Sequence, residues 1–484
     1  MTGFNQKILH GFAWEASTKF VVQIASWAST IWVARLLTPT DYGLVGISGI
    51  FTGLCIMLAG LGLGRALVNR REITEQQKSN IFWASIGVAL AFYLGIYLFA
   101  PFAAHYYESP ELVAIIRFSG TMILISPLGI VPRAILARQM QFKKIALMAF
   151  WANFLVIVLT LSMAFAGYGY WSLVVPTISS EILIIIIAFY HVRFIPRAPR
   201  NLTDTVPLIK YGLNIIGAGL VSFLNGSWPV LIAGQLFGTK ATGYYQFSNT
   251  VARLPMNKIA SIFASVAFPV FSRMQDNKKQ LKNTFLQMHK YLFIVIAPMF
   301  AGMALCAPQF VPILLGNQWL PIIVPVQILC VANILGGSTF LMPVLLDGLG
   351  RADVSFKYEL LMMFIFPAAL LTGTQWGLNG MLLALAMATP IGYVFLVSNV
   401  LATLELSANE FIKSLSGPIT CSIAMVFAVL TIENYSNTDS IAIILASKIL
   451  VGLAAYSLLY CLFWPHDISK IWRLIRGRGE VVEA

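Results

Sequence analysis

Two segments of the chain carry polar side chains that recur every three or four residues inside otherwise apolar sequence. The first set is Glu15, Lys19, Gln23, Ser26 and Thr30. The second set is Gln246, Asn249, Arg253, Asn257 and Ser261. This spacing places each set on one face of a helix. Such faces can bind an anionic, sugar-bearing ligand, because Arg and Lys pair with phosphate and amides bond to hydroxyls.

Three further polar residues are candidates for the same binding surface. Asn225 lies in the apolar segment that precedes the second set. Lys258 points well away from Arg253 around the helix, so it faces either the ligand or a neighbouring helix. Arg117 lies near the end of an apolar stretch, so it is either a ligand-binding group or an anchor at that end.

Two carboxylates are candidates for coupling to an ion, either H⁺ or Na⁺. Glu181 is the one acidic residue near the middle of an apolar segment, where a carboxylate can take up a proton or bind a cation. It can equally be a packing residue that bonds to its neighbours. Glu15 lies one helical turn before Lys19 and can simply pair with it.

The rest of the chain must fold around these residues in a membrane. Hydrophobic residues make up 58% of the 484 residues and charged residues only 11%, whereas an average soluble domain has about 25% charged residues. A crossing takes about 20 apolar residues, and a crossing with its short connection takes about 35, so the chain holds about 14 spans. We predict them at roughly 12–36, 42–67, 79–101, 111–131, 145–166, 171–192, 207–235, 243–269, 287–310, 321–345, 356–373, 379–401, 417–433 and 441–464.

The net charge of +13 is explained by where the cations lie. Alternate connections and the C-terminal tail are basic, and the other connections are nearly bare. The basic groups are Arg70, Arg71 and Lys78; Arg133, Arg138, Lys143 and Lys144; Arg193, Arg197 and Arg200; Arg273, Lys278, Lys279 and Lys282; Arg351 and Lys357; and Lys470, Arg473, Arg476 and Arg478. Basic loops stay in the cytoplasm, so both termini are predicted to be cytoplasmic, and a nucleic-acid partner is not expected.

Enzymatic chemistry is not expected from this sequence. The five cysteines show no CxxC or mixed Cys/His spacing, so we predict no metal site. There is no GxxxxGK[ST] motif, and the connections opposite the basic ones are too short for a catalytic loop. We therefore predict a protein that is not an enzyme and that carries no cofactor, apart from a possible coupling ion.

An internal repeat organises the spans. The segment 36–43 and the segment 236–243 share Leu and Gly at a constant offset of 200 residues, and Ser48 matches Ser248. Both segments join two long spans on the sparsely charged side. This parallel repeat predicts an N-terminal lobe of six spans (1–200), a C-terminal lobe of six spans (201–402), and a third region (403–484) with two extra helices and a basic tail.

Several motifs resemble the polysaccharide exporters of the MOP (multidrug/oligosaccharidyl-lipid/polysaccharide) superfamily, particularly Wzx-type flippases of the colanic and teichuronic acid branch. The motifs are VARLLTPTDYG at 33–43, LGLGRALV at 61–68, PRAILARQMQFKK at 132–144 and GYGYWSLV at 167–174. The second half matches mainly in organisation. Relatives often carry an acidic residue shortly after an Asn in the seventh span, and Asn225-Gly226-Ser227-Trp228-Pro229 lacks it.

The resemblance implies an all-α polytopic membrane protein of 14 helices, with two six-helix lobes in a V. It implies that a flippase moves undecaprenyl-diphosphate-linked oligosaccharide across the bacterial inner membrane, by alternating access, for lipopolysaccharide or exopolysaccharide biosynthesis. A polysaccharide polymerase or co-polymerase is a further candidate partner. Two alternatives stay open: a multidrug-type exporter of small molecules, and a non-transporting scaffold of a polysaccharide assembly complex.

Overall fold

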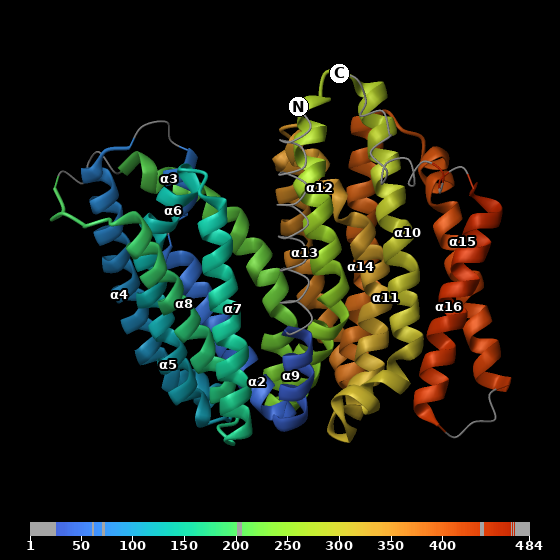
Figure 1. Cartoon of the computed structure of the whole chain (residues 1–484), viewed down its shortest axis with the longest axis horizontal. Helices are drawn as coiled ribbons and strands as arrows, with labels where there is room; N and C mark the ends of the chain where they lie inside the picture. Colours follow the sequence, from blue (N-terminus) through green and yellow to red (C-terminus); the bar gives the residue numbers. More distant parts are fainter. Residues whose placement is uncertain are drawn as a thin grey trace, which may run out of the picture. The chain divides into compact units, whose positions relative to one another are not determined.

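The computed structural model describes residues 26–60, 62–69, 73–200, 206–435, 440–465, 467 and 469. Within these residues all regular structure is helical. The elements are α2 (Pro39–Ala59), α3 (Leu63–Asn69), α4 (Glu75–Tyr106), α5 (Glu111–Ile125), η1 (Ser126–Gly129), α6 (Ile130–Arg138), α7 (Phe142–Phe165), α8 (Trp171–Val192), α9 (Val206–Arg273), α10 (Lys278–Phe310), η3 (Val311–Leu315), η4 (Asn317–Ile322), α11 (Ile323–Thr339), α12 (Leu341–Gly348), α13 (Ala352–Gly373), η5 (Thr374–Trp376), α14 (Gly377–Leu404), α15 (Ala408–Tyr435) and α16 (Ile441–Phe463) (Figure 1).

The predicted spans correspond to these helices. Within the described residues, 11 segments are long and apolar enough to cross a membrane. Each predicted span from residue 42 onward overlaps one of them, and both Gly219–Leu254 and Ala352–Leu404 overlap two. The all-α polytopic membrane fold is therefore confirmed. The number 14 stays a prediction, since most of the span 12–36 lies outside the described residues.

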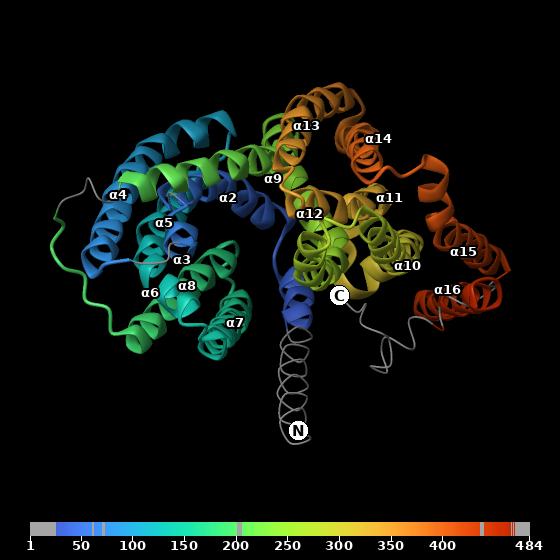
Figure 2. The same ribbon diagram turned by 90° about the horizontal axis from the view of Figure 1, so that it is seen from above.

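The chain forms two compact units, Met1–Gln246 and Phe247–Ala484. In the first unit α4 packs on α5, α7 on α8, and α2 on α5; in the second, α10 packs on α11 and α15, and α13 on α14 (Figure 2). The helix α9 contributes to both units, and it breaks at Gly238, whose φ of 77° ends the first half. The predicted divisions at 200 and 402 stay predictions.

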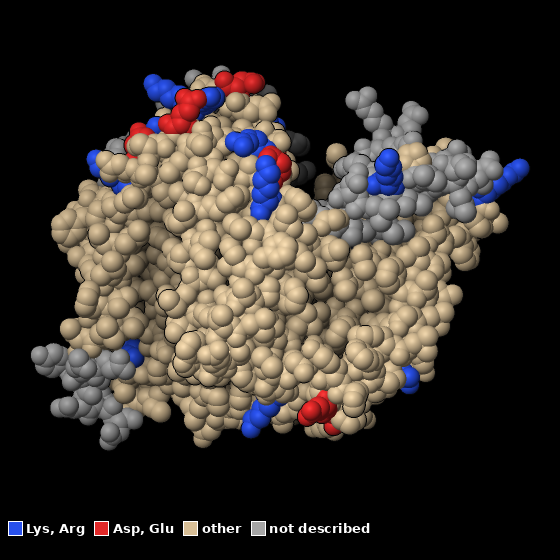
Figure 3. Space-filling model, turned by 180° about the vertical axis from the view of Figure 1, so that it is seen from behind, with Lys and Arg blue, Asp and Glu red and all other residues tan. Residues whose placement is uncertain are grey.

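On the face drawn in Figure 3, Lys, Arg, Asp and Glu gather near two opposite edges, and other residue types cover the surface between them. A band free of charge is what the hydrocarbon region of a membrane requires.

The basic connections of the first unit meet at one end. The start of α4 bonds to the segment that follows α8: Asn80 Nδ2 donates to the carbonyl of Arg200 over 2.7 Å, and Trp83 Nε1 to that of Arg197 over 2.9 Å. Arg138, at the end of α6, donates to the carbonyl of Leu67 in α3 over 2.7 Å. Three connections that the sequence grouped by charge therefore lie together, as a shared membrane side requires.

The opposite end of the first unit holds the repeated glycines in direct contact. A Cβ on Gly43 would lie 1.8 Å from the carbonyl oxygen of Thr239, and a Cβ on Gly243 would lie 1.6 Å from that of Pro39. The contact is reciprocal at the same 200-residue offset that relates the two sequences. Only glycine allows backbones to approach this closely, which explains why both segments carry one at this place.

The start of α2 is fixed by its own capping residues. Asp41 Oδ2 accepts from the backbone N–H of Thr38 over 2.8 Å, and Thr38 Oγ1 accepts from the N–H of Asp41 over 3.3 Å. This capping box, with Pro39 in the first turn, satisfies N–H groups that a helix start leaves open.

In the second unit, α10 contains two prolines, and each frees the carbonyl four residues earlier. The carbonyl freed by Pro298 belongs to Ile294, and it accepts from the hydroxyl of Tyr456 in α16 over 2.8 Å. The carbonyl freed by Pro308 belongs to Ala304, and it accepts from Gln327 of α11 over 3.1 Å. The two carbonyls that the prolines free in α10 thus accept hydrogen bonds from neighbouring helices.

Further polar contacts hold α16 against α10. Lys448 is 2% exposed, and its ammonium donates to the carbonyl of Leu305 and to Gln309 Oε1, each over 3.1 Å. Beyond the end of α16, Asp467 pairs with Lys290 of α10. Because buried polar groups require partners, these contacts fix α16 along its length on the second unit.

Candidate functional site

The two predicted polar stripes are described to different extents. Lys19, Gln23 and Glu15 lie outside the described residues. Asn257 and Lys258 lie on the helical backbone of α9, but their side chains lie outside the described set. The stripe of the second set can therefore be followed from Gln246 to Arg253.

The described part of this stripe runs along the second half of α9. The side chain of Gln246 lies over Gly46, since a Cβ on that glycine would be 2.5 Å from Gln246 Nε2. Asn249 is half-buried, and Arg253 is exposed on the helix surface. Arg253 lies in a segment apolar enough to cross a membrane, where a cation costs at least about 2.5–3.5 kcal/mol on insertion scales. That cost applies at the centre of a membrane helix, whereas Arg253 lies one residue before the end of the segment Gly219–Leu254.

Asn225 and Arg117 lie in the first unit. Asn225 is buried at 8% exposure in the first half of α9, on the other side of the break at Gly238. Arg117 lies on α5, where its Nε donates to the carbonyl of Tyr97 over 3.3 Å and its guanidinium lies 4.1 Å from the centre of that ring. These contacts hold the guanidinium of Arg117 against α4, and its role stays a prediction.

Glu181 is paired with a cation that the sequence assigned to a loop. Its side chain, 11% exposed on α8, forms an ion pair with Arg133, whose Nη1 also lies 3.5 Å from Glu181 Oε2. The predicted span ended at 131, which placed Arg133 in a connection. That placement is wrong, because α6 continues to Arg138 and carries Arg133 on its first turn.

A break in the chain positions Arg133. The element from Glu111 to Arg138 is interrupted by η1, which contains Pro127, as expected for a proline within a span. Past this break, Arg133 Nε donates back to the carbonyl of Gly129 over 3.3 Å. The guanidinium also lies against the Cα of Gly129, where a Cβ would be 2.4 Å from Nη2.

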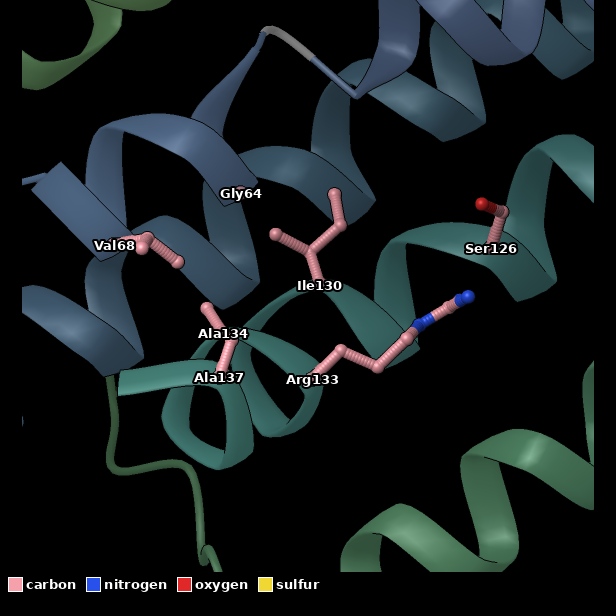
Figure 4. Close-up of a pocket in the computed structure, with 7 residues that line it drawn as sticks. All are labelled: Gly64, Val68, Ser126, Ile130, Arg133, Ala134 and Ala137. Carbon is pink, nitrogen blue, oxygen red and sulfur yellow. The ribbon is translucent and has the colours of Figure 1, made fainter. Parts of the chain in front are cut away.

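Arg133 borders a pocket of about 490 Å³ between α3, η1 and α6. Figure 4 shows the Arg133 and Ser126 side chains at one side of this pocket, with apolar side chains from α3 and α6 at the other. The lining residues are Gly64, Val68, Ser126, Ile130, Arg133, Ala134 and Ala137. The pocket therefore combines one cation and one hydroxyl with apolar walls.

Sequence reasoning missed the role of Arg133, although a signal was present. A carboxylate in the middle of a span needs a compensating partner. Pro127 marked a break in the helix, and the cation Arg133 follows it six residues later.

Within the described residues, no group of three or more His, Cys, Asp or Glu is arranged to hold a metal ion.

Comparison with known proteins gives the family. The family model for polysaccharide biosynthesis proteins matches residues 32–324, which is more than half of the chain. The lipopolysaccharide biosynthesis protein WzxC of Escherichia coli K12 is 24% identical and aligns over 86% of both chains. The teichuronic acid biosynthesis protein TuaB of Bacillus subtilis 168 is also 24% identical, over 99% of this chain and 100% of its own length.

Among solved structures, the lipid II flippase MurJ in an inward closed conformation has the same fold. It superposes with a TM-score of 0.78 at 15% identity, over 94% of this chain and 100% of its own. The helical fold and the family match agree with the motifs at 33–43, 61–68, 132–144 and 167–174. The chain is thus a polytopic all-α membrane protein that belongs to the polysaccharide biosynthesis protein family.

Proposed function

We propose that this chain is a flippase that moves undecaprenyl-diphosphate-linked oligosaccharide across the bacterial inner membrane for the synthesis of a surface polysaccharide. The observation that carries the proposal is the family match over 32–324, joined to a fold shared with a protein titled a lipid II flippase. Relatives that match nearly the whole chain are named for lipopolysaccharide and teichuronic acid biosynthesis. The flippase title of the structural neighbour supports transport in place of catalysis.

The charge of the polar stripes supports an anionic ligand. Arg253, Lys19, Lys258 and Arg117 are the proposed partners of the diphosphate, since Arg and Lys bind phosphate. The amides of Gln23, Asn249, Asn257 and Asn225 are the proposed partners of the sugars. Of these, Arg253 has the strongest support, because it is exposed within an apolar helix.

The proposed orientation follows from the basic connections. They meet at one end of the first unit, so we propose that this end and both termini face the cytoplasm. Alternating access would then carry the head group from this side to the other. Coupling to H⁺ or Na⁺ through Glu15 or Glu181 and assembly with a polymerase stay part of the proposal. A multidrug-type exporter is less well supported, since cationic drugs require carboxylates.

Complementation tests the proposal. A strain that lacks this chain should lose its surface polysaccharide, and the wild-type chain should restore it. We expect Arg253→Ala to restore little and the charge-conserving Arg253→Lys to restore more, with equal amounts of each variant in the membrane. Full rescue by the double variant Lys19→Ala, Arg253→Ala would remove the cationic residues from the mechanism.

A further inference from the structure

The guanidinium of Arg133 is held in place but not saturated. Nε bonds to the carbonyl of Gly129, and both terminal nitrogens face Glu181. A guanidinium has N–H groups beyond those that these contacts use, and the side chain of Arg133 is 38% exposed. It can therefore pair with an incoming anion while its Nε stays bonded to the carbonyl of Gly129.

The surroundings of this guanidinium fit a phosphate ester that bears a hydrocarbon chain. Arg133 and Ser126 supply a cation and a hydroxyl at one side of the pocket. Arg binds phosphate in a bidentate manner, and such charge-assisted bonds are stronger than neutral ones. Ile130, Ala134 and Val68 supply an apolar wall next to them, against which a hydrocarbon chain can lie.

Glu181 explains how the site stays intact when no ligand is bound. A cation without a partner inside a membrane protein is costly, and the nearly buried Glu181 compensates Arg133 across the interface of α6 and α8. A phosphate group would compete with this carboxylate for the same guanidinium. The carboxylate is thus a resident counter-ion that the ligand displaces in part.

We propose that Arg133 and Ser126 form a binding subsite for a phosphate or diphosphate monoester, that Glu181 is its resident counter-ion, and that Gly129 is the surface on which the guanidinium rests. This inference rests on the proposed function and adds to it, besides the polar stripes, a subsite within the first unit. A diphosphate-bearing lipid would place its head group on Arg133 and its first isoprene units along the apolar wall.

Binding measurements on the purified full-length chain in detergent test the proposal. The probes are farnesyl diphosphate, inorganic pyrophosphate and farnesol, each titrated by calorimetry. We expect farnesyl diphosphate to bind more tightly than farnesol, and Arg133→Gln to weaken its binding at least tenfold. If pyrophosphate binds as tightly as farnesyl diphosphate, the subsite recognises free phosphate groups; if farnesyl diphosphate binds more tightly, it recognises a lipid head group.

Two glycine variants separate the effect of the position of the Arg133 guanidinium on binding from the effect of its charge. Gly129→Ala should weaken farnesyl diphosphate binding, because the new Cβ displaces the guanidinium while its charge remains. Gly95→Ala in α4, where a Cβ meets nothing within 4 Å, is the matched control and should bind like the wild type. Glu181→Gln should bind as tightly as the wild type or more tightly, since it removes the competing anion.

Two results would overturn the inference. One is unchanged affinity in Arg133→Gln, with thermal unfolding showing an intact fold; the other is an equal loss of affinity in Glu181→Gln and Arg133→Gln, which would make the pair purely structural. If Arg133→Gln still binds the diphosphate normally while the strain exports its polysaccharide, the subsite is wrong and the flippase function stands. If the diphosphate binds as expected but the strain exports polysaccharide without this chain, the function is wrong.

Discussion

The reciprocal contact of Gly43 and Gly243 predicts a large effect from a single methyl group. In Gly43→Ala the new Cβ would lie 1.8 Å from the carbonyl oxygen of Thr239, whereas ordinary van der Waals contact begins at 3.4 Å. The two backbones would have to separate by about 1.6 Å. Overpacking typically costs about 1–3 kcal/mol, and we expect at least the upper end, because a backbone carbonyl cannot rotate away as a side chain can.

Thermal unfolding of the purified protein measures this cost. Cys306, Cys330 and Cys421 are buried, so a thiol-reactive fluorophore reports their exposure as the chain unfolds. Gly49→Ala is the matched control in the same helix, since its Cβ would meet nothing within 4 Å and Ala favours a helix by about 0.8–1 kcal/mol over Gly. Gly43→Ala should unfold at a clearly lower temperature than this control.

The double variant sharpens the test. Because Gly43 and Gly243 belong to one contact, Gly43→Ala and Gly243→Ala together should cost less than the sum of the two single changes. The reasoning is refuted if Gly43→Ala unfolds at the same temperature as Gly49→Ala, or if the two effects simply add.

Three further predictions concern bonds at the ends and breaks of helices. Tyr456→Phe should lower the free energy of unfolding by about 1–2 kcal/mol, measured by thermal unfolding, since the carbonyl of Ile294 then loses its partner. Thr38→Ala should cost about 1 kcal/mol in the same assay, because it removes the cap of α2. Lys278, 2.5 Å from Glu405, lowers the pKa of the Glu405 carboxyl. A lowered pKa in the folded state means that this pair stabilises the fold above the pKa of the unfolded chain and that the effect fades as the pH falls through the folded pKa. Glu405→Gln should therefore be slightly less stable than the wild type at pH 7 and equal to it in acid.

Each of these predictions has a control. Tyr190→Phe removes a hydroxyl from a side chain that is 79% exposed, so it should leave stability unchanged. An equal loss of stability in Tyr456→Phe and Tyr190→Phe would contradict the role of the Tyr456 bond to the carbonyl that Pro298 frees. Thr38→Ser keeps the capping oxygen and should retain most of the stability. For Glu405, a difference from the wild type that persists in high salt would contradict an exposed ion pair, since salt screens such charges.

Much of the fold could be predicted because its signals are local. Apolar length identifies a membrane helix, and the prediction of a helix at 171–192 matches the bounds of α8. The grouping of basic connections also follows from sequence alone, since it needs only the order of spans. The repeat predicted a relation between Gly43 and Gly243, but not that the two glycines touch.

The candidate site was harder to predict because its contacts are distant in sequence. Glu181 stands out in the sequence as a carboxylate in the middle of a span, but its partner Arg133 is 48 residues away in the chain. The predicted span ended seven residues before the end of α6, which assigned Arg133 to a loop. Lys448 lay unnoticed in an apolar segment, and its acceptors Leu305 and Gln309 belong to a helix more than 130 residues earlier. Helix ends and tertiary partners are set by packing, which a single sequence does not display.

Transfer of a lipid-linked saccharide between leaflets tests the proposed function most directly. The purified chain is reconstituted in vesicles that contain an isoprenyl-diphosphate-linked oligosaccharide, and a sugar-modifying enzyme added outside measures how much becomes accessible. We predict that vesicles with the chain expose nearly the whole pool, whereas protein-free vesicles expose only the outer half. Accessibility that stays at one half, with a folded chain in every vesicle, would contradict the account.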